Sequence, residues 1–290
     1  MKYSVSTYSF SSLLNSGAMT QMDCIAKAKE MGFDAVEFVD ILPHNGSSRE
    51  EYAKLLKAEC ERVGLEISNY TVGADFLTDS DGNTEKEIER VCREVDIAVI
   101  LGATSMRHDA TVGFPSGKRG FRGFDDALPL LAKSCLSVTQ YAESKGIRTM
   151  IENHGYFCQD SRRVEKLVNA VAHPNFGLLC DMGNFLCADE SPELAFGRVA
   201  PYAFYAHAKD FLWKNGNEGN PGRGFFPTRA GNYLRGTIIG HGIVPVKQCL
   251  SLLKSNGYDG TIAIEFEGLE PALDAIAIGL ENLKRFAGEI

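Results

Sequence analysis

The sequence of 290 residues has no long apolar run, no excess of basic residues and no paired cysteine motif. Its most apolar stretch, DIAVILGA, is far shorter than the roughly 20 residues that a membrane-spanning helix needs, so we expect no membrane association. The N-terminus, MKYSVSTYSF, lacks the apolar core and the small-residue cleavage site of a signal peptide. The net charge of −8 argues against a protein that binds the phosphate backbone of a nucleic acid.

The eight cysteines are scattered along the chain, without a C-x-x-C pair and without the spacing of a disulfide framework. In a chain of this length without a signal peptide, reduced thiols are the better interpretation. We therefore expect a cytoplasmic protein with free cysteines.

Short apolar runs alternate with longer stretches of helical periodicity. We expect strands in YSVSTYSF, AVEFV, LEISNYTV, ATSMRH, RTMIEN, FGLLCD, AFYAHA and TIAIEFE. We expect helices at about residues 20–31, 48–63, 84–101, 125–145, 161–172, 191–199, 245–256 and 270–287. Thr20 and Ser48 are suitable N-caps, each followed three residues later by an acid. Glycines follow several predicted helix ends: Gly32, Gly64, Gly102, Gly146 and Gly257.

Eight strands that alternate with eight helices imply a parallel sheet with helical crossovers. An open, doubly wound sheet is the alternative, but YSFSSLLNSG after the first strand is no dinucleotide-binding fingerprint. We therefore predict an α/β fold, a (β/α)8 TIM barrel that forms a single domain over residues 1–290. Two connections, at about 109–124 and 211–236, are longer than a barrel needs. Such loops serve as lids, binding loops or contacts in a homo-oligomer.

Polar side chains stand at the ends of the last four predicted strands, where the active site of such a barrel lies. These residues are Glu152 and His154, Asp181, His207 and Lys209, and Glu265 and Glu267. Side chains alternate along a strand, so the two residues of each pair share a face. Asp181 alone would as often cap a turn. Four acids and imidazoles that face inward, however, would be unfavourable unless a cation lies among them.

We therefore predict one divalent metal ion held by Glu152, Asp181, His207 and Glu265. Two glutamates, one aspartate and a single histidine form an oxygen-rich set of ligands. This set favours Mn²⁺, with Mg²⁺ or Co²⁺ as alternatives, and it also admits catalytic Zn²⁺.

The same four residues carry a resemblance to the xylose-isomerase-like barrel superfamily of sugar phosphate isomerases and epimerases. They lie within IENHG, CDMGNF, HAKDF and GYDGTIAIEFEG, and the resemblance extends over essentially the whole chain. It implies a metal-dependent isomerase or epimerase that acts on a keto-sugar or sugar phosphate, with Glu152 and Glu265 exchanging the proton of the substrate carbon. Epimerases of this family often have a histidine where this chain has Asn184, and His154 is found in some branches only.

Abstraction of a proton beside a carbonyl requires a base, and a divalent ion is the electrophile that stabilises the enediolate. Glu152 and Glu265 would then act from opposite faces of the sugar. His154 could donate to the oxyanion, act as a separate base, or form a hydrogen bond with a metal ligand. One of Arg107 and His108 is expected to face the site. The weaker candidates for substrate binding are Glu37, His108, Lys209, Arg235 and Glu267.

Three other functions compete with an isomerase or epimerase. A lyase that dehydrates a polyol ketone, or cleaves an oxidised glycoside, shares the fold and the metal. An apurinic endonuclease would need more metal-binding histidines than a chain with six is expected to supply, and a basic face. A non-catalytic sugar-binding barrel would have no need of the complete set of metal ligands.

Overall fold

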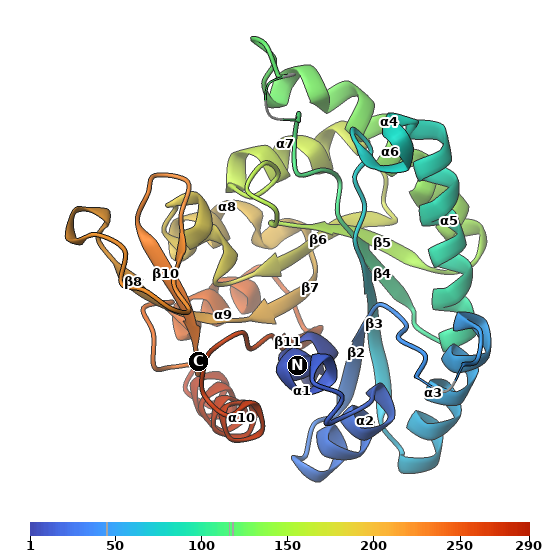
Figure 1. Ribbon diagram of the computed structural model, residues 1–290, viewed down its shortest axis with the longest axis vertical. Coiled ribbons are helices and arrows are strands. Elements are labelled where there is room, and N and C mark those ends of the chain that lie inside the picture. The colour runs from blue at the N-terminus through green and yellow to red at the C-terminus, as the bar shows by residue number, and fades with distance from the viewer. Residues whose placement is uncertain (45, 116, 118) are drawn as a thin grey trace.

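The computed structural model describes residues 1–44, 46–115, 117 and 119–290. Eight parallel strands close into a barrel in the order β1-β11-β7-β6-β5-β4-β3-β2, surrounded by helices (Figure 1). The strands are β1 (Lys2–Ser6), β2 (Ala35–Val39), β3 (Glu66–Val72), β4 (Ser105–His108), β5 (Arg148–Glu152), β6 (Phe176–Asp181), β7 (Ala203–Ala208) and β11 (Thr261–Ile264). The predicted single-domain (β/α)8 TIM barrel is confirmed.

Eight long helices cover the outside of the barrel, each within two residues of its predicted bounds. They are α2 (Gln21–Glu30), α3 (Arg49–Val63), α5 (Thr84–Leu101), α6 (Phe124–Ser144), α7 (Ser161–Val171), α8 (Pro192–Val199), α9 (Val246–Ser255) and α10 (Ala272–Gly288). Capping boxes form at Thr20 and Ser48, where the side chain accepts from the backbone of the acid three residues on. Gly64 and Gly102 end their helices in the left-handed conformation.

Residues 211–236, expected as a long loop, instead contribute to a second, antiparallel sheet. Its strands are β8 (Asp210–Lys214), β9 (Phe226–Pro227) and β10 (Tyr233–Thr237), in the order β8-β10-β9. The sheet lies outside the barrel ring (Figure 1). The pairing of β8 with β10 was missed because a glycine-rich segment separates the two strands in the sequence. In the other long connection, the residues described between 109 and 123 form turns and bends without a helix or strand.

A layer of side chains inside the barrel sets the position of the polar residues above it. Met150, Leu179, Tyr205 and Ala263 pack together as a buried cluster, one from each of β5, β6, β7 and β11. The residue two positions further along each of these strands points to the same side. Those four residues are Glu152, Asp181, His207 and Glu265. The alternation of the strands thus brings the four polar side chains to one level of the barrel.

Two further properties follow from the chain's packing. Over the residues that the structure describes, no helix is long and apolar enough to cross a membrane. All eight cysteines are free, and all except Cys92 are buried. Burial raises the pKa of their thiols, to about 12 for Cys24 and Cys60 and to about 11 for Cys92.

Candidate metal centre

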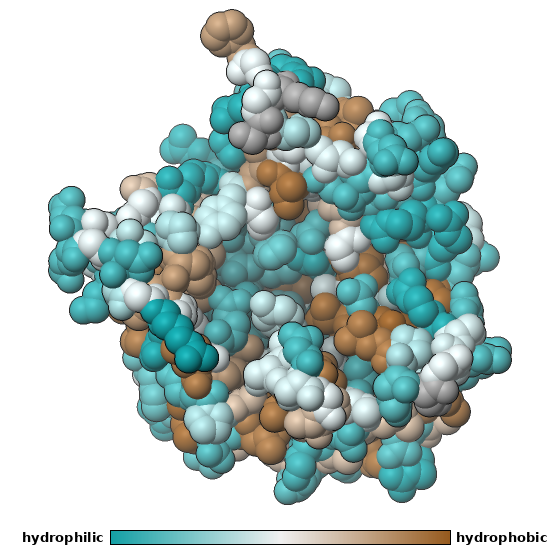
Figure 2. Space-filling view, in the orientation of Figure 1, coloured by the Kyte–Doolittle hydropathy of each residue, from teal (hydrophilic) through white to brown (hydrophobic). Residues whose placement is uncertain are grey.

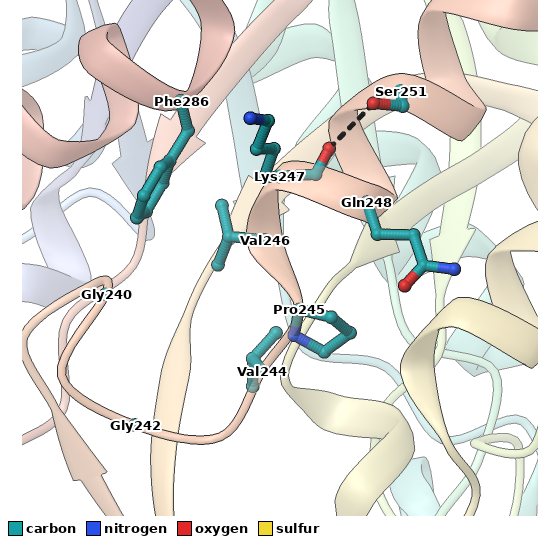
Figure 3. Close-up of a pocket in the computed structure, with 9 residues that line it drawn as sticks. All are labelled: Gly240, Gly242, Val244, Pro245, Val246, Lys247, Gln248, Ser251 and Phe286. Carbon is teal, nitrogen blue, oxygen red and sulfur yellow. Dashed lines mark hydrogen bonds between the residues drawn. The ribbon is translucent and has the colours of Figure 1, made fainter. Parts of the chain in front are cut away.

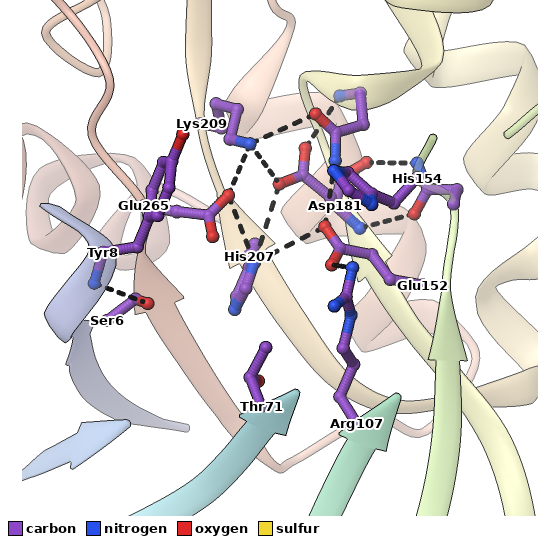
Figure 4. Close-up of polar contacts among 12 residues, drawn as sticks. Ser6, Tyr8, Thr71, Arg107, Glu152, His154, Asp181, His207, Lys209 and Glu265 are labelled. Atoms are coloured by element: carbon purple, nitrogen blue, oxygen red, sulfur yellow. Dashed lines mark hydrogen bonds and ion pairs between the residues drawn. The ribbon is translucent and has the colours of Figure 1, made fainter. Parts of the chain in front are cut away.

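The four predicted ligand residues lie together at the carboxyl ends of their strands (Figure 4). Glu152, Asp181, His207 and Glu265 each offer one ligand atom, and these atoms all lie within 4.8 Å of one another. Asp181 and His207 are fully buried, and the two glutamates are at most 8% exposed. Three carboxylates this close together repel one another strongly away from water unless a positive charge lies among them.

Two buried atoms in this cluster have no hydrogen-bond partner: Nδ1 of His207 and Oδ2 of Asp181. The His207 Nδ1 lies 3.6 Å from Asp181 Oδ2, 3.7 Å from Glu265 Oε2 and 3.8 Å from Glu152 Oε1. These separations are too long for hydrogen bonds. Leaving such an atom unpaired costs about 1–3 kcal/mol. The arrangement fits a divalent cation that completes the contacts of all four atoms.

Glu37 on β2 fixes the orientation of His207 from below. Its Oε2 lies 2.7 Å from His207 Nε2, and its Oε1 accepts from Asn69 Nδ2 at 2.9 Å and Thr71 Oγ1 at 2.6 Å. A carboxylate bonded to one ring nitrogen leaves the other nitrogen directed at the metal position, a common support for histidine ligands. Burial opposes a charge on the ring, yet Glu37 and Glu265 raise the pKa of His207 well above its ordinary value.

Asp181 uses its two carboxylate oxygens for different purposes. Oδ1 accepts from the backbone of Gly183 at 2.8 Å and of Asn184 at 2.7 Å, so it caps the turn after β6. Oδ2 is left for the centre of the cluster. The Asn153 side chain binds the backbone of Asp181 on both sides: its Nδ2 donates to the Asp181 carbonyl at 3.0 Å, and its Oδ1 accepts from the Asp181 N–H at 2.9 Å. The end of β6 is therefore held by the residue that follows β5.

Glu152 belongs to a chain of charged groups that runs toward the barrel mouth. Its Oε2 lies 2.7 Å from Arg107 Nη2, and its Oε1 accepts from Asn184 Nδ2 at 2.9 Å. Arg107 also pairs with Asp109 at 2.7 Å, and Asp109 holds His154 Nδ1 at 3.0 Å. Burial opposes ionisation of Asp109, but Arg107 and His154 lower the pKa of its carboxyl to about 2. Asp109 in turn outweighs the effect of burial on His154 and raises the pKa of its imidazole.

Lys209 is the second cation of the site. Its Nζ contacts Glu265 Oε2 and lies 3.4 Å from Asp181 Oδ2 and 3.7 Å from Glu267 Oε2. Burial lowers the affinity of the amine for a proton, but these carboxylates raise the pKa of Lys209 well above its usual value. Lys209 is therefore a charged donor at the edge of the cluster.

A cavity of about 150 Å³ opens above these side chains. Its lining consists of Tyr8, Val39, Thr71, Arg107, Glu152, His154, Lys209, Glu265 and Glu267. The space-filling view shows a hollow at the centre of this face, lined largely by hydrophilic residues (Figure 2). Five of the predicted site residues thus reach a space that a small molecule can enter: Glu152, His154, Lys209, Glu265 and Glu267.

Three predicted substrate-binding residues do not line this cavity. Glu37 is fully buried beneath His207. His108 lies on the opposite face of β4, with its ring centroid 5.8 Å from that of Phe76, and its neighbour Arg107 takes the inward position. Arg235 lies on β10 and pairs with Glu270 at 3.3 Å, because the second sheet carries it to one side of the mouth.

Four residues of the site were not predicted from the sequence as site residues: Tyr8, Thr71, Asp109 and Asn184. Asp109 directly follows β4, so its place at a strand end was the one available signal. Tyr8 follows β1 within a short 3-10 helix, η1 (Thr7–Phe10), for which no pattern indicates a direction.

A larger groove, of about 530 Å³, lies elsewhere on the molecule, between α10 and the segment that enters α9 (Figure 3). Its walls include Val244, Val246 and Phe286, and Lys247 is the only charged residue among the described residues that line it. Without a carboxylate or an imidazole among the described residues that line it, this groove offers no side chain of the metal-binding kind found at the barrel mouth. Carboxylates, an imidazole and paired cations line the smaller cavity at the barrel mouth instead.

Comparisons with known proteins agree with the fold. The family model described as xylose isomerase-like TIM barrel matches residues 25–286. An inosose dehydratase from Lacticaseibacillus casei is 24% identical over 144 residues, which are 49% of this chain and 48% of that protein. The match therefore spans about half the length of the curated relatives.

Two solved structures share the fold at low identity. A xylose isomerase-like TIM barrel protein from Mycobacterium smegmatis in complex with magnesium superimposes with a TM-score of 0.69 and 20% identity, over 92% of this chain and 88% of that one. The 3-keto-D-glucoside 4-epimerase from E. coli superimposes with a TM-score of 0.72 and 15% identity, over 98% and 99%. At these identities the likeness concerns the fold alone.

Proposed function

Because the chain belongs to the xylose isomerase-like TIM barrel family, we propose that it is a divalent-metal-dependent isomerase or epimerase of a keto-sugar. The observation that carries this proposal is the cluster of Glu152, Asp181, His207 and Glu265 beneath an open cavity. These four residues would hold Mn²⁺ first, with Mg²⁺, Co²⁺ or Zn²⁺ as alternatives. A divalent ion bound there supplies the electrophile that stabilises the negative charge of an enediolate.

The two glutamates divide the proton transfer between them in this proposal. Glu152 at the end of β5 and Glu265 after β11 are separated in the barrel by β6 and β7. One carboxylate removes the proton from the carbon beside the carbonyl. In an epimerase the other carboxylate returns a proton to that carbon from the opposite side, and in an isomerase a proton is returned to the former carbonyl carbon while the two oxygens exchange a proton. Arg107 and Asn184 fix the direction of Glu152, while Lys209 fixes Glu265. Lys209 also donates a hydrogen bond to a substrate oxygen that gains negative charge.

A lyase is the second candidate, and one observation favours it. His154 lines the cavity, its side chain is 48% exposed, and Asp109 holds its Nδ1. Its Nε2 is then free to remove a proton while an acid assists the loss of a hydroxyl group on the neighbouring carbon. The curated relatives are dehydratases, which supports keeping this alternative.

Isotope exchange tests the proposal directly. Metal-loaded protein is incubated with a panel of keto-sugars in deuterated water, and the products are analysed by NMR and mass spectrometry. Deuterium at a single carbon, with a change of configuration or of carbonyl position, is the expected result. An enone that absorbs in the near ultraviolet would assign the lyase instead. If no sugar exchanges a proton or loses water, the proposed function is wrong.

A further inference from the structure

A second cavity, of about 190 Å³, adjoins the cavity of the metal centre. It lies between η1, the short helix α1 (Ser11–Asn15) and the segment after β11, and its lining includes Ser9, Ser12, Phe266 and Gly268. Tyr8 and Glu267 line both cavities, so the two spaces meet at these side chains. Neither space alone reaches the roughly 300 Å³ at which small-molecule sites begin, but the two together do. We refer to the two adjoining spaces as the metal-centre compartment and the second compartment.

The walls of the second compartment are fixed. Ser9 Oγ donates to the Ile264 carbonyl at 3.0 Å and accepts from the Phe266 backbone at 2.9 Å. These two bonds fasten η1 to the end of β11. A Cβ atom at Gly268 would come within 2.5 Å of the Phe266 ring, so the chain approaches this wall closely. Tyr8 is 41% exposed and lines both compartments, so its aromatic side chain is accessible to a ligand.

The charges of both compartments are unfavourable for a phosphate. Among the described residues that line them, the positively charged candidates are Arg107, Lys209 and His154. Arg107 pairs with Glu152 and Asp109, and Lys209 pairs with Glu265. His154 pairs with Asp109. The second compartment is lined by the Glu267 carboxylate and by no cation. A dianion placed there would be repelled by Glu267 and would meet, among the described lining residues, no cation that is not already paired with a carboxylate.

We propose that the second compartment binds an uncharged, ring-sized group joined to the reacting sugar, which makes the substrate an oxidised glycoside rather than a sugar phosphate. The reacting keto-sugar occupies the space above the four metal ligands, and its aglycone or second sugar ring lies against Tyr8. This inference rests on the proposed function and specifies its substrate class.

Four matched substrates test the inference: a keto-sugar, its methyl glycoside, its phenyl glycoside and its phosphate ester. Deuterium exchange catalysed by the metal-loaded protein is measured for each. We expect kcat/KM for the phenyl glycoside to exceed that for the free keto-sugar by about tenfold or more, and the phosphate ester to be the poorest substrate. Equal values for phenyl glycoside and free sugar, or a preference for the phosphate ester, would overturn the inference.

Two variants, one in α1 and one just after it, test whether the preference for the phenyl glycoside arises in the second compartment. Ser12 is exposed and lines only the second compartment, so Ser12→Trp fills that space. Ser16, just beyond α1, is exposed and lines neither compartment, so Ser16→Trp is the matched control. The ratio of kcat/KM for phenyl glycoside to that for free sugar should fall about tenfold in Ser12→Trp. It should keep the wild-type value in Ser16→Trp. An unchanged ratio in Ser12→Trp contradicts the assignment.

Calorimetry separates this inference from the proposed function, because it requires no turnover. Unoxidised phenyl glycoside is titrated into metal-free wild-type protein and into both variants, with the sugar phosphate as comparison. Binding of the phenyl glycoside should weaken about tenfold in Ser12→Trp alone. If deuterium exchange is confined to the free sugar or the sugar phosphate, the proposed function stands and the glycoside as substrate is contradicted. If no substrate of the panel exchanges, the proposed function is contradicted, while calorimetry still decides whether the second compartment binds the ring.

Discussion

The first four strands of the barrel and the last four contribute differently to the site. β5, β6, β7 and β11 each lead to one residue that offers a ligand atom, and we call this the ligand half. β1 to β4 supply none of the four, but they supply groups that orient them, and we call this the support half. Glu37 on β2 holds His207 on β7, and Arg107 on β4 holds Glu152 on β5. The four ligand atoms thus come from one half of the barrel, and the other half supplies two of the side chains that orient them.

The largest effect is expected in the ligand half. Glu152→Gln and Glu265→Gln should retain the fold, because the amide is nearly isosteric with the carboxylate, but each variant loses an acid–base group and an anionic ligand. Turnover should fall by at least about 10²–10⁴-fold even at saturating metal. Deuterium-exchange rates measure the loss, and circular dichroism checks the fold. His154→Ala is the comparison, since a lyase that uses His154 as base would lose turnover there with metal binding near normal. Near-full activity in either glutamate variant would move the chemistry toward His154.

Within the support half, we expect the largest loss of stability when Arg107 is replaced. Arg107→Met leaves the buried carboxylate of Glu152 and the partly buried carboxylate of Asp109 without their shared partner. The free energy of unfolding of the metal-free protein should fall by about 3–5 kcal/mol, as measured by urea denaturation. The control is Arg62→Met, which breaks an exposed pair with Glu59 and should leave the free energy of unfolding nearly unchanged. A similar loss in both variants would show that Arg107 is no special support.

Glu37 tests whether the support half acts through the metal. Glu37→Gln keeps the shape of the side chain but removes the charge that orients His207. The metal affinity should fall about 10- to 100-fold, which titration calorimetry measures. Glu94→Gln changes another buried glutamate, one that pairs with Arg49 instead of a metal ligand, and should leave metal affinity unchanged. If Glu37→Gln binds metal as tightly as the wild type, the contact with His207 has no role in binding.

The smallest effect is expected at His108, on the outer face of the strand that carries Arg107. Burial lowers the pKa of His108 to about 4, below the ordinary value of 6.5. The unfolded chain therefore takes up a proton first, and stability is lost as the pH falls from 6.5 toward 4. Between pH 7 and pH 5 this group should remove about 2 kcal/mol from the free energy of unfolding. Urea denaturation of the wild type and of His108→Leu at both pH values isolates this contribution. An equal change in the free energy of unfolding between pH 7 and pH 5 in the two proteins would exclude it.

The ligand half could be predicted from the sequence and most of the support half could not. Glu152, Asp181, His207 and Glu265 each follow an apolar strand, and alternation alone places them on one face. Which of Arg107 and His108 points inward depends on the pairing of β4 with β5, where Arg107 lies beside the inward-facing Met150. That register cannot be read from four residues. A register shift between β2 and β3 likewise decides that Asn69 lies beside Glu37, and irregularities of this kind have no local signature.

Contacts across the barrel also could not be predicted from the sequence. Glu37 and His207 are 170 positions apart, and the pattern of each strand gives a face but no distance to the opposite wall. The bond between Asp109 and His154 could not be predicted for a different reason, because both residues lie in connections whose path is set by their neighbours.

The free thiols can report the order in which parts of the barrel unfold. They are spread over both halves: Cys24 in α2, Cys60 in α3, Cys92 in α5, Cys135 in α6, Cys158 after β5, Cys180 in β6, Cys187 after β6 and Cys249 in α9. Only an exposed thiolate reacts readily with an alkylating reagent, so a buried thiol is modified when its own segment opens. Alkylation of the unaltered chain at increasing urea, followed by peptide mass spectrometry, therefore shows in which order the support half and the ligand half come apart.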